Sequence, residues 1–191
     1  MRGRSVLLIA GLGIGSTLLA STPATARPIE QGHFHDVFTS EVYDCDGTLA
    51  QDYVDVSGSF LVNQRGSSPF PYYRESVHGT VVTTNLETGG TYTTVFTANS
   101  KDQTIVDNGD GTITITVNAS GGTRYYDTDG NFVLKDPGHV VYAFDVDYNG
   151  TPSDPSDDVE VPGSFRIVRP STGNSDFSDR DFCADLVEFT S

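Results

Sequence analysis

One segment of this sequence is best suited to bind a metal ion, because it carries oxygen-bearing side chains at alternate positions. Asp145, Asp147 and Asn149 are spaced two residues apart and are followed by Gly150. In calcium loops of the D-x-D-x-D/N-G type, oxygen atoms at alternate positions converge on the ion and the glycine permits the bend. The predicted calcium ligands are Asp145, Asp147, Asn149, Asp154 and Asp157.

The same segment departs from the EF-hand pattern in two ways. Its twelfth position is Ser156 rather than a bidentate glutamate, and Pro152 and Pro155 lie inside the loop. An acidic hairpin loop without an ion is therefore the alternative interpretation. Calcium in this loop is expected to stabilise the native fold, with no catalytic part.

Two histidines form a second candidate metal site. His33 and His35 lie on one face of a predicted strand, a spacing that cupin-type metal sites use, and His139 is a distant third ligand of the right type. Glu41 is set a little too far along the chain to complete such a site. A polar strand face is the alternative interpretation.

The chain has two cysteines, Cys45 and Cys183. In an exported protein they are expected to form one disulfide, which would tie the first strand region to the last segment of the chain. A reactive thiol or a metal ligand is the alternative. Because the enclosed loop is long, the chain-entropy model allows a stabilisation of up to about 5 kcal/mol.

A proline-stiffened aromatic segment runs from Ser68 to Glu75 at the entrance to a predicted strand. Tyr and Arg recur at binding surfaces, so the segment is a candidate rim for a ligand pocket. The alternative, which we favour on the sequence, is a loop packed over an open end of the fold.

Charge and missing motifs exclude several classes of function. The net charge of −15 repels phosphate backbones and anionic membranes, so nucleic acid is not an expected partner. The sequence has no G-x-S-x-G, no H-E-x-x-H and no paired C-x-x-C. We expect a non-enzymatic protein that binds a small molecule or a protein partner. A structural or envelope-associated protein is the first alternative, and an enzyme of unidentified class is the second.

The first residues predict export. Arg2 and Arg4 precede an apolar run, and Ala24 and Ala26 form the Ala-x-Ala end of a secretory signal peptide. The run is shorter than the roughly 20 residues that a membrane span needs. The predicted organisation is a signal peptide over 1–26 and a single secreted β domain over 27–191.

Apolar and polar residues alternate through most of the chain, which is typical of strands that bury one face. The predicted strands lie near 33–44, 53–63, 72–86, 91–99, 103–107, 112–119, 123–126, 132–135, 139–147 and 164–169, and the predicted reversals at 89–90, 108–111, 121–122 and 127–131. Consecutive hairpins predict an all-β antiparallel meander, most simply an up-and-down β-barrel, with a two-sheet β-sandwich as the alternative. One short helix is expected near the C-terminus, starting after residues 178–181.

Three segments of the sequence, at 67–75, 107–114 and 145–152, resemble segments of small secreted proteins from high-GC Gram-positive bacteria. The similarity extends over most of the chain after the signal peptide. That group has no assigned activity, so the resemblance implies an extracellular location and no mechanism.

Overall fold

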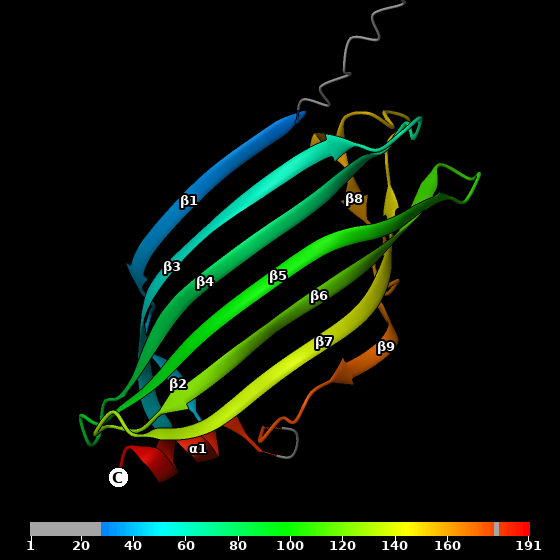
Figure 1. Ribbon diagram of the computed structural model, residues 1–191. Helices are drawn as coiled ribbons and strands as arrows, with labels where there is room; N and C mark the ends of the chain where they lie inside the picture. Colours follow the sequence, from blue (N-terminus) through cyan, green and yellow to red (C-terminus); the bar gives the residue numbers. More distant parts are fainter. Residues whose placement is uncertain (1–27, 178–179) are drawn as a thin grey trace, which may run out of the picture.

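A computed structural model describes residues 28–177 and 180–191 (Figure 1). The predicted signal peptide, 1–26, lies outside the described residues, and so do Ser178 and Asp179 at the expected start of the helix. In the described part of the chain, no helix is both long and apolar enough to cross a membrane.

The described chain forms one antiparallel sheet and one short α-helix, α1 (Phe182–Phe189). The strands are β1 (Glu30–Thr39), β2 (Tyr43–Cys45), β3 (Thr48–Gln64), β4 (Pro71–Asn85), β5 (Thr91–Asp107), β6 (Thr112–Tyr126), β7 (Phe132–Asp147), β8 (Val159–Glu160) and β9 (Arg166–Thr172). Their order in the sheet is β1-β3-β4-β5-β6-β7-β8, with β2 also beside β3 and β9 also beside β7. The predicted all-β meander and C-terminal helix are confirmed.

The sheet curls into a half-barrel (Figure 1). Among the described residues β1 pairs with β3 and β9 with β7, so the curl stays open between these two edge strands. The described residues therefore form one curled sheet that has the curvature of the expected barrel without its closure, and they do not form the alternative two-sheet sandwich. At the β7 edge the sheet continues only with the 7 residues of β9, whose pairing with β7 shifts register twice.

Four predicted boundaries are wrong. Residues 121–122 form no reversal but lie inside β6, and the expected break between 99 and 103 is a β-bulge inside the single strand β5. The expected break between 135 and 139 lies inside the single strand β7, and the expected strand 33–44 is divided into β1 and β2. Two adjacent glycines are a common signal for a turn. In β6, however, the backbone of the neighbouring strand β5 lies so close to Gly121 that a side chain has no room there. A Cβ on Gly121 would collide with the carbonyl oxygen of Thr97 on β5.

The helix α1 closes one end of the half-barrel, which we call the closed end. Its N-terminus is capped by Asp181, whose side chain accepts a hydrogen bond from the N–H of Ala184 (2.9 Å). Leu186 is fully buried against Tyr92 of β5. At the other terminus, Thr190 accepts a hydrogen bond from the buried side chain of Asn85 (2.9 Å).

A disulfide joins Cys45 at the end of β2 to Cys183 in α1. Cys45 is buried in the same apolar cluster as Leu186, so the bridge fastens the helix to the sheet from inside the core. This confirms the predicted pairing.

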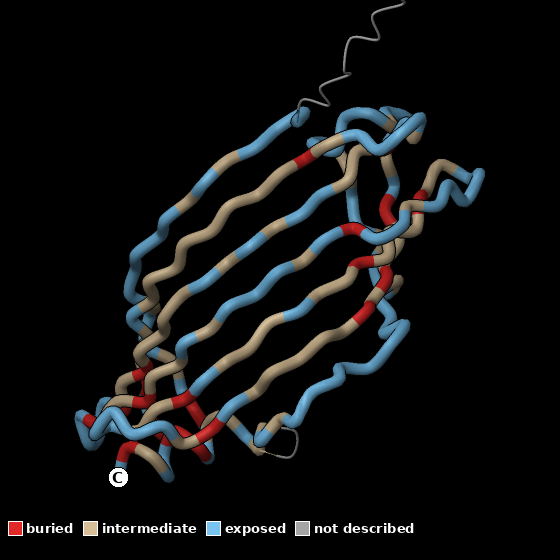
Figure 2. The backbone as a smooth tube through the Cα atoms, in the orientation of Figure 1, coloured by how far each residue is buried: buried red, intermediate tan, exposed pale blue. Residues whose placement is uncertain are grey.

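A second, smaller core lies at the opposite end, which we call the loop end. It consists of Phe70, Ile113 and Val146, against which the ring of Tyr148 packs. The burial map in Figure 2 shows buried residues gathered at these two ends, whereas the middles of the strands are half-buried or exposed. The sheet is thus held by a core at each end, and in the described part of the chain no second layer covers its middle.

Candidate functional site: an open apolar trough lined with carboxylates

The two faces of the long strands differ in chemistry. Residues opposite each other on neighbouring strands share a face. The inner, concave face is the one on which α1 packs at the closed end, and Figure 1 views the sheet from its outer, convex side. We call the uncovered inner face between the two cores the trough. Its surface is formed by Phe34, Val56, Phe60, Val77, Phe96, Ala98, Gly121, Gly138, Val140 and Tyr142.

Aromatic rings lie flat on part of this surface because glycines stand opposite them. Phe60 of β3 faces Gly32 of β1, and a Cβ on Gly32 would come within 2.5 Å of the Phe60 ring. Phe34 of β1 occupies in the same way the space that a Cβ on Gly58 would need. The glycines therefore let the rings cover the edge of the trough, giving it an apolar floor that ends at the open strand β1.

A hollow of about 590 Å³ lies in the trough over β5, β6 and β7. Its floor is one row of small residues, Ala98, Gly121 and Gly138, which stand opposite one another across the three strands. Larger side chains surround this row, and the lining includes Glu75, Phe96, Tyr125, Asp136, Val140 and Tyr142. The volume lies within the range of small-molecule sites, about 300–1,000 Å³.

Every charged residue that the long strands place on the inner face is acidic. These residues are Glu30, Asp36, Asp52, Glu75, Asp102, Asp107 and Asp136. The 4 histidines and all the Lys and Arg residues of β1 and β3–β7 lie on the outer face. An acidic composition predicts excess carboxylates everywhere, but it does not predict this separation. The trough therefore combines an apolar floor with a negative potential.

Carboxylates and tyrosines meet at the part of the trough nearest the loop end. Burial, the charge of Glu75 and hydrogen bonding to Glu75 raise the pKa of Tyr73 to about 12. Burial and the charges of Asp102 and Glu75 raise the pKa of Tyr142. Both phenols thus stay neutral over the physiological range. Neutral aromatic faces beside a carboxylate form a suitable environment for an organic cation.

Asp102 is a buried acid of this region, with 7% of its surface exposed. Its Oδ2 accepts a hydrogen bond from the backbone N–H of Tyr73 (2.7 Å). Burial raises the pKa of Asp102, and the Tyr73 N–H and Arg65 offset part of that rise. The carboxylate fixes the backbone from which the Tyr73 side chain projects.

We expect Asp102→Asn to make the protein more stable than the wild type at neutral pH. The folded-state pKa of Asp102 is raised, so its ionised form costs stability above that pKa, and the cost disappears as the pH falls below the unfolded-state value. Asparagine has no charge and keeps an oxygen acceptor for the Tyr73 N–H. Denaturant unfolding of both proteins at pH 7 and at about pH 3 measures the effect. An advantage of the variant that persists at the acid pH would contradict the assignment to ionisation.

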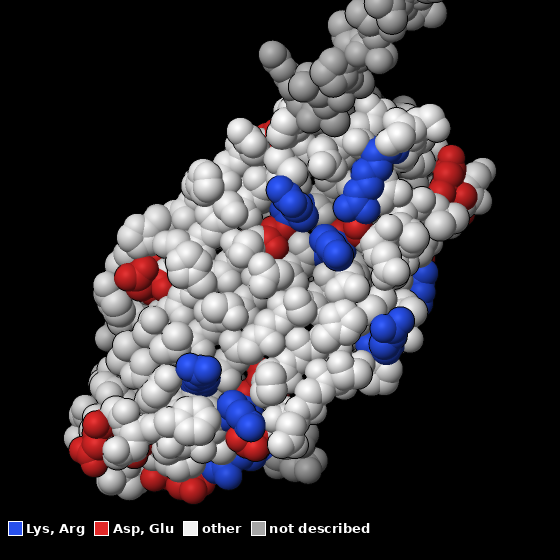
Figure 3. Space-filling view, in the orientation of Figure 1, with Lys and Arg blue, Asp and Glu red and all other residues white. Residues whose placement is uncertain are grey.

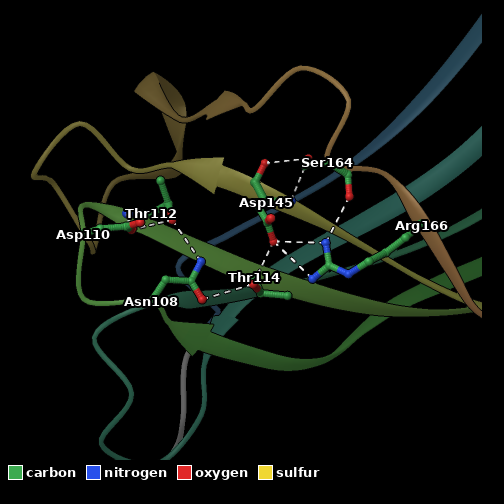
Figure 4. Close-up of polar contacts among 7 residues, drawn as sticks. All are labelled: Asn108, Asp110, Thr112, Thr114, Asp145, Ser164 and Arg166. Carbon is green, nitrogen blue, oxygen red and sulfur yellow. Dashed lines mark hydrogen bonds and ion pairs between the residues drawn. The ribbon is translucent and has the colours of Figure 1, made fainter.

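Asp145, the first predicted calcium ligand, lies on the outer face and is held by neighbouring strands (Figure 4). Its Oδ1 accepts hydrogen bonds from Thr114 Oγ1 (2.7 Å) and from both terminal nitrogens of Arg166 (3.3 Å), and its backbone N–H donates to Ser164 Oγ (2.9 Å). These contacts lower the pKa of Asp145, with the Thr114 bond the largest cause. Asp145 here joins β6 and β7 to the segment that leads into β9.

The other four predicted ligands form hydrogen bonds within the loop. Asp147 accepts from the N–H of Asn149 (2.8 Å), and the Asn149 amide donates to the carbonyl oxygen of Asp157. Asp157 accepts from Thr151 (2.7 Å), while Asp154 caps the 3-10 helix η1 (Pro155–Asp157). Among the described residues, no three carboxylates of this loop bring oxygens within 4.8 Å of one another. Calcium binding to the loop stays a prediction.

The histidines considered for a second metal site lie apart. His35 hydrogen-bonds Asp55 of β3 (2.9 Å), and His139 on β7 hydrogen-bonds Asn118 of β6 (2.8 Å). His33 is exposed at the sheet edge, opposite Ser59. Strands β3 to β6 separate the two edge histidines from His139.

The aromatic segment 68–75 packs as a loop at its start and continues into β4, while its role as the rim of a ligand pocket stays a prediction. Phe70 is buried in the core of the loop end, as expected of a packed loop. Tyr73 and Glu75 then face the trough, and Arg74 between them faces outward, because side chains alternate along β4. The sequence contained a signal for the site residues, namely acids in phase with apolar positions. Glu75 alternates with Tyr73 and Val77 in this way.

No protein-family model, no curated protein and no solved structure matches this chain. The trough is therefore the feature from which the function of the protein is inferred.

Proposed function

We propose that the protein is an exported binding protein whose trough holds a hydrophobic amine, meaning an apolar molecule with one positively charged nitrogen. The observation that carries the proposal is the inner face, which is apolar and holds carboxylates but no basic residue of its own strands. The disulfide supports an oxidising compartment, and the Ala-x-Ala sequence supports export.

The charged nitrogen is placed beside Glu75, over the faces of Tyr73 and Tyr142. A cation over an aromatic face contributes about 0.5–2 kcal/mol, with the larger values where water is excluded. The apolar part of the ligand then covers Ala98 and Gly121, beside the Ser171 side chain that lies against Gly138. Burial of its methylene groups supplies most of the affinity, at about 0.8 kcal/mol each.

We expect decyltrimethylammonium, at concentrations below micelle formation, to bind one site per protein. Decyl sulfate has the same chain with the opposite charge and should not bind in the trough. Glu75→Gln should weaken binding of the cation about tenfold, equivalent to about 1.4 kcal/mol, and Ala98→Leu should abolish it by filling the hollow. Isothermal titration calorimetry gives both the affinity and the stoichiometry.

Glu87→Gln is the matched control, because it removes the same charge from an exposed turn between β4 and β5. This variant should bind the cation as the wild type does. Equal weakening by Glu75→Gln and Glu87→Gln would show that only the net charge attracts the ligand. That result, or equal binding of decyl sulfate, would overturn the proposal.

A further inference from the structure

The outer face of the sheet contains two pairs of like charges in direct opposition. Arg74 of β4 stands opposite Lys101 of β5, and Arg124 of β6 stands opposite Lys135 of β7. Like charges directly opposite across strands are destabilising. The chain has 26 acidic residues against 11 Lys and Arg, yet none of these four cations forms an ion pair with a described residue. Figure 3 shows the Lys and Arg side chains of this face gathered in separate groups.

One of the two pairs lines a hollow in this face. The hollow has a volume of about 660 Å³ and extends from β1 across β3, β4 and β5 to β6. Three serines, at positions 59, 76 and 120, leave it open, because they place small side chains on the outer face. The outer-face residues of its lining are Gln31, His33, Ser59, Leu61, Arg74, Ser76, Asn99, Lys101, Asn118 and Ser120. No carboxylate of the outer face belongs to this lining.

The side chains of the hollow include several hydrogen-bond donors. The side chain of His139 hydrogen-bonds Oδ1 of Asn118 (2.8 Å), which leaves the amide NH₂ group to face a ligand. Arg74 presents a planar guanidinium, the group that binds phosphate through two parallel hydrogen bonds, and Lys101 adds a point charge. Glu75, whose backbone contributes to the wall, projects its carboxylate into the trough on the opposite side of the sheet.

We propose that this outer hollow is a second binding site, for an anion of the phosphate class that carries at least two negative charges. Arg74 and Lys101 hold the anion, and Asn118 donates a hydrogen bond to it. Bound phosphate relieves the repulsion between the two cations that the sheet places side by side. The site is separate from the trough, and neither needs the other to be occupied.

Inorganic pyrophosphate, titrated at constant ionic strength into the isotope-labelled protein, is the probe. We expect amide chemical-shift changes in an NMR titration to be concentrated at the hollow on β4, β5 and β6, with saturation in the millimolar range or below. Arg74→Gln with Lys101→Gln should weaken binding at least tenfold. Arg124→Gln with Lys135→Gln removes the same charge from the other opposed pair, which does not line the hollow, and should leave binding unchanged.

Shifts that persist in the Arg74→Gln/Lys101→Gln variant would overturn the assignment of the site. Equal weakening in both double variants would overturn it as well, because general attraction of anions to basic residues would then explain the binding. The hollow makes no use of Glu75 or Ala98 side chains, so a failure here is distinguishable from a failure of the trough.

Discussion

Reduction of the Cys45–Cys183 bridge is expected to lower the free energy of unfolding by about 4–5 kcal/mol. The two cysteines are 138 residues apart, and the chain-entropy model gives about 4.7 kcal/mol for a loop of about 100 residues. The helix adds to the effect, because α1 has 8 residues and an isolated helix of that length is marginal in water. Denaturant unfolding with and without reductant, and of Cys45→Ser/Cys183→Ser, measures the loss.

The thiol count is the control for this experiment. The unfolded, unreduced protein should contain no titratable thiol. Two free thiols, or an unfolding midpoint that reductant leaves unchanged, would contradict the prediction.

Gly121→Ala is expected to destabilise the protein by about 2–3 kcal/mol, the upper part of the range of about 1–3 kcal/mol that is typical of overpacking. The new methyl group would collide with the carbonyl oxygen of Thr97 and approach the Cα of Ala98 at 3.1 Å. Both are backbone atoms of β5, so they can move only if the strand moves. Chemical denaturation followed by the far-ultraviolet circular dichroism of the sheet gives the change.

The neighbouring glycine provides the matched control. At Gly122 a Cβ would face outward and have only the Cα of Pro137 within reach, at an ordinary 3.8 Å. Gly122→Ala should therefore be neutral or stabilise the protein by about 0.5 kcal/mol, because alanine has less conformational freedom to lose on folding. A loss as large as that of Gly121→Ala would refute the steric explanation.

The alternation of side chains was sufficient to predict an antiparallel meander, although the prediction divided each of β5, β6 and β7 into two strands. Val54 and Val56 on β3, or Ile113 and Ile115 on β6, have the period of two that a half-buried strand requires. The same period could not show whether the sheet closes. Closure depends on the length and register of β9, and that segment carries no alternation strong enough to define either.

The candidate site was only partly predictable. The sequence directed attention to Asp145 because of its spacing to Asp147, but spacing does not show that Arg166 and Thr114 hold its carboxylate on the outer face. The trough depends on which residues of different strands share a row. Ala98, Gly121 and Gly138 are far apart in the sequence, and only the register of three strands brings them together.

The meander also has a consequence for the order of events during folding. Each strand from β3 to β7 pairs with the next one along the chain, so hairpins can form in succession with short loops to close. Only α1 must return across the whole sheet to reach β2. We therefore expect helix docking and oxidation to come late, after the rate-limiting step, which the folding and unfolding rates of the oxidised and reduced protein would test. A late contact mainly slows unfolding and leaves the folding rate almost unchanged, so the bridge is expected to lengthen the lifetime of the native state without speeding its formation.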